Sequence, residues 1–164
     1  MDEKGLNELS VMYDASSEAY DKLYEGIQLR KYILLYNMLK GRNILDVGIG
    51  TGYLYKNFNG YVIGIDISIR SLAIAYKRGK YIDCILGDGR DPPVRPIFDT
   101  VFCISTIHHL GDITNHIDKL LRLGRRGAIT ILKKLIEYRE VEKLAHKNGL
   151  KIIDLWDEYG LVKL

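Results

Sequence analysis

The segment at residues 46–52, DVGIGTG, is the part of the sequence whose composition and spacing best suit chemistry. Gly48, Gly50 and Gly52 alternate with other residues, and Asp46 stands two residues before the first of them. Glycines allow a tight turn and let a ligand approach the backbone where a Cβ would block it. The pattern therefore predicts a ligand-binding loop. A dinucleotide site uses the related spacing G-x-G-x-x-G, so this segment alone leaves the ligand open.

Two further carboxylates stand at the ends of the next two apolar runs. Asp66 is followed by Ile67, and Asp88 is followed by Gly89. Ligands of open parallel sheets bind beyond the carboxyl ends of the strands. There Asp66 could accept hydrogen bonds from both hydroxyls of a ribose, and Asp88 with Gly89 could bind an adenine. A dinucleotide site accounts for Asp66 but gives no reason for Asp88. The alternatives are a helix cap for Asp66 and a simple turn for Asp88-Gly89.

The fourth apolar run, at 98–106, leads into a pair of histidines. We expect Ile104, Ser105 and Thr106 to present backbone groups to the ligand where this run ends. His108 or His109 could deprotonate an acceptor, because the pKa of histidine lies near neutrality. The alternative is that both histidines only pack or cap a helix.

Short β-branched runs alternate with helical patterns from residue 43 onward. Apolar runs of this length suit strands that are buried on both faces of a parallel sheet. We expect strands at 43–47, 61–66, 82–86, 100–105 and 128–132, and helices at 51–58, 68–78, 113–123 and 136–148. Right-handed crossovers then give a doubly wound α/β fold, a mostly parallel sheet with helices on both faces. The runs at 151–156 and 161–164, joined by a polar turn, predict an antiparallel hairpin at the C-terminal edge.

The first 40 residues lack strand patterns and favour helix. Residues 5–24 are amphipathic, and residues 28–40 carry apolar side chains at helical spacing before Gly41. No repeat or linker interrupts the sequence. We therefore expect one domain over 1–164, with a helical cap at 1–40 and the α/β core at 41–164.

Composition and charge narrow the class of protein. The 164 residues are 47% hydrophobic and 27% charged, which is typical of a globular domain. The formal net charge of +3 permits an anionic partner such as RNA without requiring one. Six basic residues favour either RNA binding or a solvated surface: Arg122, Arg125, Arg126, Lys133, Lys134 and Arg139. The two cysteines suggest neither a disulfide framework nor a metal site. With no apolar run of membrane-spanning length and an acidic start, we expect a cytoplasmic protein.

Together these motifs resemble the class I S-adenosylmethionine-dependent methyltransferases. Motif I of that superfamily is an acidic residue followed by x-G-x-G-x-G, as at Asp46, and the resemblance runs from about Lys40 to Lys133. It implies a Rossmann-like fold and S-adenosyl-L-methionine as cofactor. It further implies cofactor-binding roles for Asp46 and the loop glycines, Asp66, Ile67, Asp88, Gly89, Ile104 and Ser105. The N-terminal tyrosine pattern resembles the lid of ubiquinone-biosynthesis-type methyltransferases, which implies that Tyr13 and Tyr20 fold over the cofactor.

The methyl acceptor stays open between RNA and a small molecule. The run ISTIHHL at 104–110 looks most like the tRNA wobble-uridine carboxymethyl methyltransferases, whereas the tyrosine pattern looks like small-molecule enzymes. The tetrad at 91–94, DPPV, looks like the D-P-P-Y signature of exocyclic-amine nucleic-acid methyltransferases. It precedes the fourth strand instead of following it, so we expect its prolines to shape a loop. The alternative function is a methyltransferase-fold subunit, weak or inactive alone, that acts with a protein partner.

Overall fold

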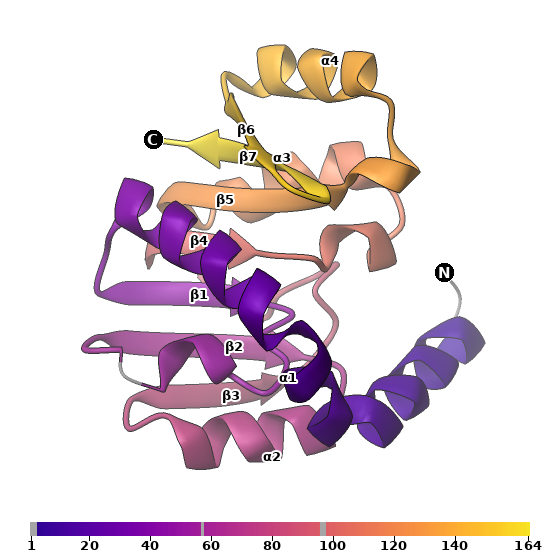
Figure 1. Cartoon of the computed structure of the whole chain (residues 1–164), viewed down its shortest axis with the longest axis vertical. Coiled ribbons are helices and arrows are strands. Elements are labelled where there is room, and N and C mark those ends of the chain that lie inside the picture. Colours follow the sequence, from indigo (N-terminus) through magenta and orange to yellow (C-terminus); the bar gives the residue numbers. More distant parts are fainter. Residues whose placement is uncertain (1–2, 57, 96–97) are drawn as a thin grey trace.

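The computed structural model describes residues 3–56, 58–95 and 98–164, and for residues 3–4, 6 and 16–25 of the first helix it gives the backbone alone. The described chain forms one sheet with helices on both of its faces (Figure 1). The strands are β1 (Asn43–Val47), β2 (Tyr61–Asp66), β3 (Ile82–Leu86), β4 (Phe98–Cys103), β5 (Gly124–Leu132), β6 (Lys151–Leu155) and β7 (Glu158–Lys163). The α-helices are α1 (Glu3–Leu39), α2 (Ile69–Arg78), α3 (Ile113–Leu121) and α4 (Tyr138–Asn148), and short 3-10 helices are η1 (Tyr53–Tyr55), η2 (Ile107–His109) and η3 (Lys133–Leu135).

The strand order is β3-β2-β1-β4-β5-β7-β6. The first five of these strands run parallel, while β7 pairs antiparallel with both β5 and β6. The chain moves outward from β1 to β3 and then returns to the other side of β1 at β4. This reversal opens a crevice beyond the carboxyl ends of β1 and β4, where doubly wound sheets bind their ligands.

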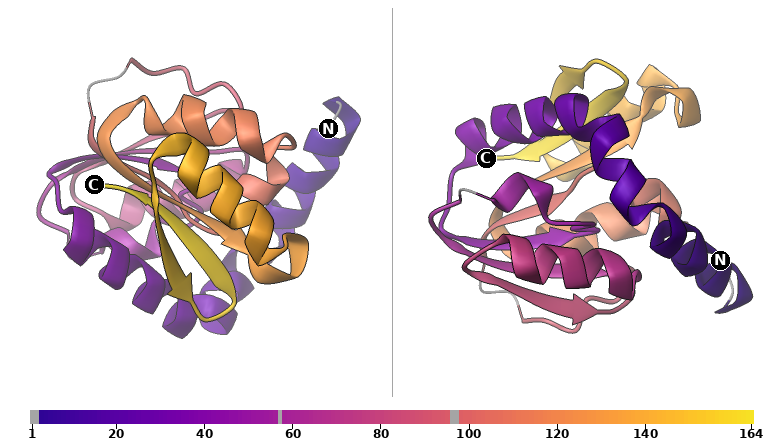
Figure 2. Two further views of the ribbon diagram at one scale, coloured as in Figure 1. Left: turned by 90° about the horizontal axis from the view of Figure 1, so that it is seen from above. Right: turned by 60° about the horizontal axis from the view of Figure 1, so that its bottom comes forward.

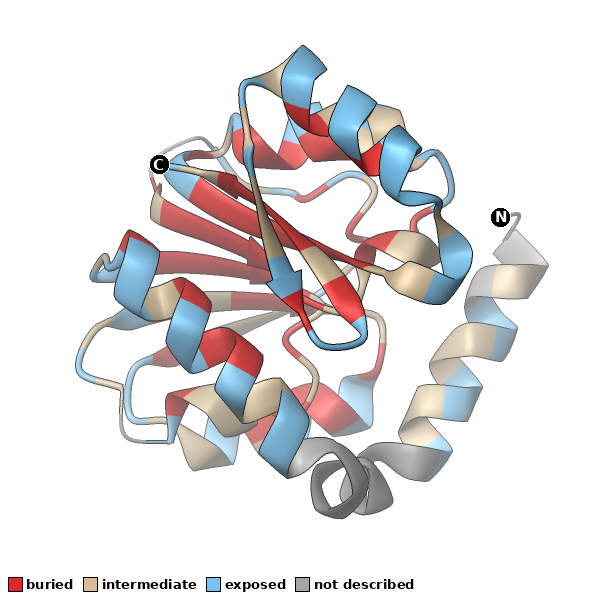
Figure 3. Ribbon diagram, turned by 45° about the horizontal axis from the view of Figure 1, so that its top comes forward, coloured by how far each residue is buried: buried red, intermediate tan, exposed pale blue. Residues whose placement is uncertain are grey.

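Two hydrophobic cores flank the sheet, because successive residues of each buried strand point to opposite faces. Ile44 and Phe102 pack with α1 and α2 on one face. Leu45 and Val101 pack with α3 and α4 on the other. Figure 2 shows these layers from two sides, and Figure 3 shows buried residues running along the central strands. The doubly wound, mostly parallel sheet predicted from the sequence is confirmed.

The first helix is longer than the pattern predicted. The two expected helical stretches form the single helix α1, which continues through Gly26. A glycine inside a helix costs only about 1 kcal/mol, which the packing of the C-terminal half of α1 readily offsets. Near the carboxyl edge of the sheet, the N-terminal part of α1 extends past the end of β2 (Figure 1).

The helix predicted at 51–58 is wrong, since the described residues of this segment form only the short η1. Gly52 adopts a left-handed conformation, with φ of 64°, at its start. The Phe58 N–H then donates to the Tyr55 carbonyl three residues back. Eight residues between Gly52 and β2 leave little room for a helix, and tyrosine, asparagine and phenylalanine form helices poorly.

The C-terminal hairpin turns earlier than predicted. The strands are separated only by Trp156 and Asp157, with Trp156 in a left-handed conformation at φ of 53°. The last strand is therefore six residues long and pairs along its length with β5. This register brings Glu158 opposite Leu132, at the carboxyl end of β5.

The remaining local expectations concern a loop, the cysteines and the membrane. Residues 87–95, which include both neighbouring prolines, form turns and not a helix. Cys103 is buried and Cys84 is half-buried, and both are free thiols. Among the described residues, no helix is both long and apolar enough to cross a bilayer. The same residues contain no group of three His, Cys, Asp or Glu side chains suited to holding a metal ion.

Candidate functional site

A pocket lies in the crevice beyond the carboxyl ends of β1, β2, β3 and β4. The glycine loop, the ends of β2 and β3, the segment after β4, and α1 contribute its walls. Its lining includes Leu9, Tyr13, Gln28, Asp46, Gly48, Gly50, Thr51, Tyr53, Asp66, Ile67, Asp88, Gly89, Ile104, Ser105, Thr106 and His109. Most of the predicted site residues therefore meet in one place. Gly52 and His108 do not line it, and the side chain of Tyr20 lies outside the described residues.

The glycine loop needs glycine for two separate reasons. Gly48, Gly50 and Gly52 have φ values of 84°, 57° and 64°, a left-handed region that other residues rarely adopt. A Cβ on Gly48 would also collide with the side chain of Thr106. The Gly48 N–H donates to the Ile65 carbonyl at 2.7 Å, which fixes the loop against β2.

Asp46 lies beneath this loop and is buried. The Tyr55 hydroxyl donates to its Oδ2 at 2.6 Å. Burial raises the pKa of Asp46 to about 7, against the opposing effect of the Tyr55 hydrogen bond. Burial and the nearby Asp46 charge raise the pKa of Tyr55 well above its usual value, so Tyr55 remains a donor.

Asp66 connects the end of β2 to the glycine loop. Its Oδ2 accepts from the Gly50 N–H at 2.8 Å, and its Oδ1 accepts from the Ser68 N–H at 2.9 Å. Burial raises the pKa of Asp66, although these backbone hydrogen bonds work against the rise. The helix-capping role belongs to Ser68, whose side chain accepts from the Ser71 N–H at the start of α2. The alternative role of Asp66 as cap of α2 is therefore filled by another residue.

Asp88 is held at the end of β3 by Arg90. Its carboxylate accepts from the Arg90 backbone N–H at 2.9 Å and from the Arg90 Nε at 2.7 Å. Burial disfavours the charged form, but the contacts with Arg90 outweigh it and lower the pKa of Asp88 below its usual value. The neighbouring Gly89 is buried, and a Cβ there would lie 2.6 Å from Val47 Cγ1. The backbone at Gly89 therefore packs closely against β1.

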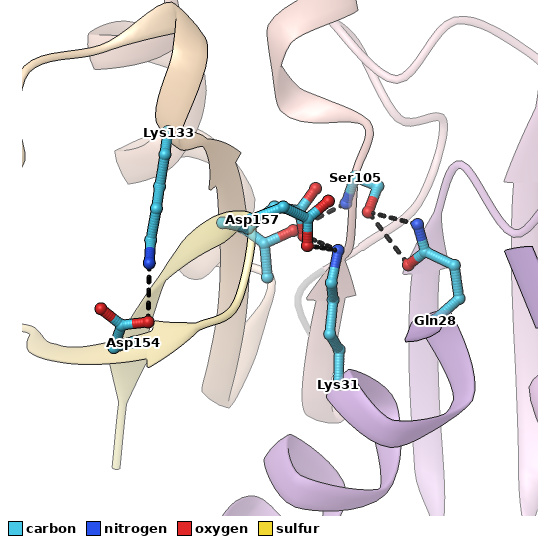
Figure 4. Close-up of polar contacts among 8 residues, drawn as sticks. Gln28, Lys31, Ser105, Lys133, Asp154 and Asp157 are labelled. Carbon is cyan, nitrogen blue, oxygen red and sulfur yellow. Dashed lines mark hydrogen bonds and ion pairs between the residues drawn. The ribbon is translucent and has the colours of Figure 1, made fainter. Parts of the chain in front are cut away.

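The segment after β4 is held from two sides. Ser105 has a left-handed φ of 55°, and its N–H donates to the Thr130 hydroxyl at 2.7 Å. Its hydroxyl exchanges hydrogen bonds of 2.9 and 3.0 Å with the amide of Gln28 on α1 (Figure 4). Gln28 is a pocket residue that sequence reasoning missed, because a lone glutamine in a helical pattern carries no signal of a partner 77 residues away.

His109 and Tyr13 meet across the mouth of the pocket. The Tyr13 hydroxyl and His109 Nε2 lie 2.9 Å apart. Burial lowers the pKa of His109, which favours the neutral form of its imidazole. His108 differs, because burial, His109 and Lys134 lower its pKa to about 4, and its Nδ1 is buried without a hydrogen-bond partner among the described residues. Of the two histidines, only His109 faces the pocket.

The N-terminal part of α1 spans the pocket. On one side the Ser10 hydroxyl donates to the Ile67 carbonyl at 2.9 Å, and Asp14 accepts from the Ser68 hydroxyl at 2.5 Å. On the other side Tyr13 reaches His109. The described residues of this part of α1 thus touch both walls of the pocket.

The C-terminal half of α1 is fixed by a buried cation. Lys31 Nζ lies 2.8 Å from Asp157 Oδ1 and 3.1 Å from Glu158 Oε2, and the side chains of Lys31 and Glu158 are fully buried. Figure 4 shows Lys31 and Gln28 reaching from α1 toward the hairpin and Ser105. Two neighbouring polar residues of α1, Gln28 and Lys31, therefore hold its C-terminal half in place over the sheet.

The comparisons with known proteins agree with this architecture. The model of the methyltransferase domain family matches residues 45–132, more than half of the chain. The chain is 34% identical to the tRNA U34 carboxymethyltransferase of Hahella chejuensis over 108 residues, which cover 60% of this chain and 33% of that protein. It is 29% identical to the ubiquinone biosynthesis O-methyltransferase of Nitrobacter winogradskyi over 100 residues, which cover 57% of this chain and 38% of that protein. The chain thus spans about a third of the length of the curated relatives it matches.

Solved structures share the fold at low sequence identity. Magnesium protoporphyrin IX methyltransferase from Synechocystis PCC 6803, with bound SAH, superposes with a TM-score of 0.70 at 15% identity, over 96% of this chain and 98% of that one. A Haloferax volcanii methyltransferase in complex with the Trm112 methyltransferase activator gives a TM-score of 0.69 at 16% identity, over 87% of this chain and 77% of that one. With the family match, the sheet order and the loop at 46–52 in place, the chain belongs to the class I S-adenosylmethionine-dependent methyltransferase domain family.

Proposed function

We propose that this chain binds S-adenosyl-L-methionine in the pocket beyond β1 to β4 and transfers its methyl group to an acceptor near the end of β4. One observation carries the proposal. Three consecutive strand ends bring Asp46, Asp66 and Asp88 to a single pocket together with the glycine loop. An adenosine joined to an amino acid offers a ribose, an adenine and an ammonium group, which are partners for three such carboxylates.

Asp66 suits the ribose hydroxyls. Each of its oxygens already accepts one backbone N–H, and a carboxylate has about four acceptor sites in all. The Ile67 N–H is a third backbone donor to this carboxylate, and the remaining acceptor capacity is available to hydroxyl donors. These donors would favour the charged carboxylate and offset the cost of its burial. Ile67, next in sequence, supplies an apolar wall to the same part of the pocket.

Asp88 and Gly89 suit the adenine. Arg90 holds the Asp88 carboxylate in its charged form and in a fixed position, which leaves acceptor sites for an exocyclic amino group. Gly89 packs closely against Val47, so at this point the pocket wall consists of backbone that carries no side chain.

The glycine loop and Asp46 suit the methionine part. The backbone of Gly48 and Gly50 faces the pocket without side chains, and the buried Asp46 lies beneath. A nearby ammonium would favour the ionised form of Asp46, as any close cation does. Ile104 and Ser105 would border the same end of the cofactor.

The acceptor side is formed by Ser105, Thr106, His109 and Tyr13. When bound, the cofactor supplies an activated methyl group on a sulfonium, and the electron pair of the breaking bond leaves with the sulfur. The chain then has to position the acceptor nucleophile and remove its proton. Neutral His109 is the proposed base, and Tyr13 positions its ring. Tyr13, and Tyr20 as proposed from sequence, would close the pocket against water. RNA and small molecules both remain candidate acceptors.

Calorimetric titration with S-adenosylhomocysteine tests the cofactor site. We expect binding by the wild type and a loss of affinity of at least about 100-fold in Asp66→Ala, because that variant loses two charge-assisted hydrogen bonds and the support of Gly50. Asp118→Asn is the matched control, since Asp118 pairs with Arg122 on the exposed side of α3 and lies outside the pocket. Binding of NAD in place of S-adenosylhomocysteine, or equal loss in both variants, would overturn the assignment.

The second candidate function is a methyltransferase-fold subunit that acts with a protein partner. The complex of the Haloferax methyltransferase with its activator supports it. The two functions differ in one measurement. Transfer of labelled methyl to RNA or small-molecule fractions by the chain alone favours the enzyme, whereas S-adenosylhomocysteine binding without any transfer favours the subunit.

A further inference from the structure

A second hollow lies at the opposite edge of the sheet from the cofactor pocket. It is formed where α1 ends and where β1, β4 and β5 begin, at the amino ends of these parallel strands. Its lining consists of Tyr36, Asn37, Lys40, Gly41, Arg42, Asp99, Arg125 and Arg126. Nothing in the proposed methyl transfer uses these residues.

The corner between α1 and β1 is held in place by hydrogen bonds. The Arg126 guanidinium donates to the Leu39 carbonyl at 2.6 Å, and the Thr100 hydroxyl donates to the Lys40 carbonyl. Gly41 has φ of 129°, and a Cβ there would lie 2.7 Å from Thr100 Oγ1. The backbone around Lys40 is therefore positioned by tertiary contacts and is more than a loose connection.

Four cationic side chains surround the hollow, and all four residues are exposed: Lys40, Arg42, Arg125 and Arg126. The single carboxylate, Asp99, accepts from the backbone N–H groups of Arg42 and Asn43 at 3.0 and 3.1 Å. These hydrogen bonds lower the pKa of Asp99, with help from Arg125 and Arg126. Within the described chain, Lys40, Arg42 and Arg125 form no ion pair.

The lining of the hollow has an excess of three positive charges. It holds four of the 24 Lys and Arg residues and one of the 21 Asp and Glu residues. The rest of the sequence therefore carries 20 of each sign and is neutral overall.

Most of the basic residues singled out from the sequence do not line the hollow. Arg122 pairs with Asp118 at 2.8 Å, and Lys133 pairs with Asp154 at 2.7 Å (Figure 4). Only Arg125 and Arg126 of that set reach the hollow, where Lys40 and Arg42 join them from a distant part of the sequence.

We propose that this hollow binds the phosphate backbone of a nucleic acid. Arginine presents a planar set of donors that matches phosphate oxygens. Cations that are exposed and spread around an open hollow fit an extended polyanion better than one small enclosed anion. The proposal goes beyond the methyl transfer and does not depend on it, because binding here requires no cofactor.

Fluorescence anisotropy with a labelled single-stranded oligouridylate tests the proposal. The test variant is Arg42→Ala/Arg125→Ala, which keeps the backbone N–H that Asp99 accepts and leaves Arg126 in place. The control is Arg139→Ala/Lys147→Ala, which removes the same charge from the exposed side of α4. Affinity for S-adenosylhomocysteine should be the same in all three proteins, since both changes lie away from the pocket.

We expect the test variant to bind the oligonucleotide at least about tenfold more weakly at low salt, and the control variant less than about threefold. If four cations contact phosphates, the slope of log affinity against log salt should be about −2.8 in the wild type and about −1.4 in the test variant. Equal weakening in both variants would show a general charge effect and overturn the site. So would saturation of the hollow by inorganic pyrophosphate without any oligonucleotide binding. A parallel titration with oligothymidylate shows which nucleic acid is preferred.

Discussion

Tyr55 donates its hydroxyl proton to the carboxylate of Asp46 across 2.6 Å, beneath the loop that carries the glycines. Both side chains are buried, and Tyr55 packs edge-on against Tyr32 with ring centroids 5.2 Å apart. The hydrogen-bonded pair of Tyr55 and Asp46 supports the glycine loop, where the sequence had predicted a helix at 51–58. Its energetic consequence is a carboxyl group that titrates near neutrality.

Stability without cofactor should fall as the pH rises through the titration of Asp46. The folded pKa of about 7 lies above the usual 3.8, so the folded chain binds the proton more tightly than the unfolded chain. The stabilisation is complete below about pH 4 and is lost as the pH rises toward 7. Between pH 5 and 7.5 the contribution of Asp46 should decrease by about 2.5 kcal/mol.

Urea unfolding at both pH values measures this effect as a difference between wild type and Asp46→Asn. The asparagine keeps an acceptor for Tyr55 but does not titrate. Subtracting the variant removes the contribution of other groups, including His108, whose lowered pKa acts in the opposite direction. Parallel pH profiles for the two proteins would contradict the assignment.

Gly48→Ala should destabilise the chain and abolish cofactor binding. The new Cβ meets the Thr106 side chain, and the φ of 84° strains any residue other than glycine. We expect a cost of about 2–4 kcal/mol in urea unfolding. Gly26→Ala is the control, because a Cβ at this exposed helical position has no neighbour within 4 Å. That change should stabilise α1 by about 0.5–1 kcal/mol, and destabilisation of equal size at both positions would refute the steric explanation.

Three of the five parallel strands could be predicted closely from the sequence, whereas β4 begins two residues and β5 four residues earlier than expected. The expected ranges at 43–47, 61–66 and 82–86 match β1, β2 and β3, because each is a short apolar run bounded by polar or glycine residues. The same pattern placed Asp46, Asp66 and Asp88 at consecutive strand ends. Parallel strands bring such positions to one edge, and the pocket follows from that geometry.

Contacts between distant parts of the sequence could not be predicted. Lys31 stands between Arg30 and Tyr32 in a helical pattern and looks like a solvated lysine, yet its side chain is fully buried. Its partners depend on where the hairpin turns, and the last strand was expected to begin three residues too late, at Leu161 instead of Glu158. The hydrogen bond between Gln28 and Ser105 could not be predicted for the same reason, since it requires α1 to pack across the sheet.

Lys31→Met should destabilise the chain by about 3–5 kcal/mol, because it leaves the buried Glu158 carboxylate without a counter-charge. Among the described residues, the Glu158 oxygens have no hydrogen-bond donor besides this ion pair. The double variant Lys31→Met/Glu158→Leu removes both charges and should recover most of the loss.

Lys133→Met is the comparison for this pair. Lys133 and Asp154 form an ion pair of 2.7 Å in which the Asp154 side chain is 73% exposed, so its loss should cost less than about 1 kcal/mol. Urea unfolding of the four proteins gives all three differences. A double variant as unstable as Lys31→Met alone would show that packing, and not the unpaired charge, sets the cost.

The Tyr13 hydroxyl should control the hydrogen-bonding state of His109 before any acceptor binds. Tyr13→Phe removes the 2.9 Å contact with Nε2, so the ¹⁵N resonance of that nitrogen should shift while those of His116 and His146 stay in place.

If His109 is the base and Tyr13 positions it, His109→Gln should lower methyl transfer by about 100-fold or more, with S-adenosylhomocysteine affinity within about threefold of wild type. Tyr13→Phe should lower transfer less, because the base is still present. Tyr138→Phe, which changes a tyrosine packed on Tyr159, serves as the control. Unchanged transfer in His109→Gln would remove His109 from the reaction and leave the Tyr13 contact as a closure of the pocket only.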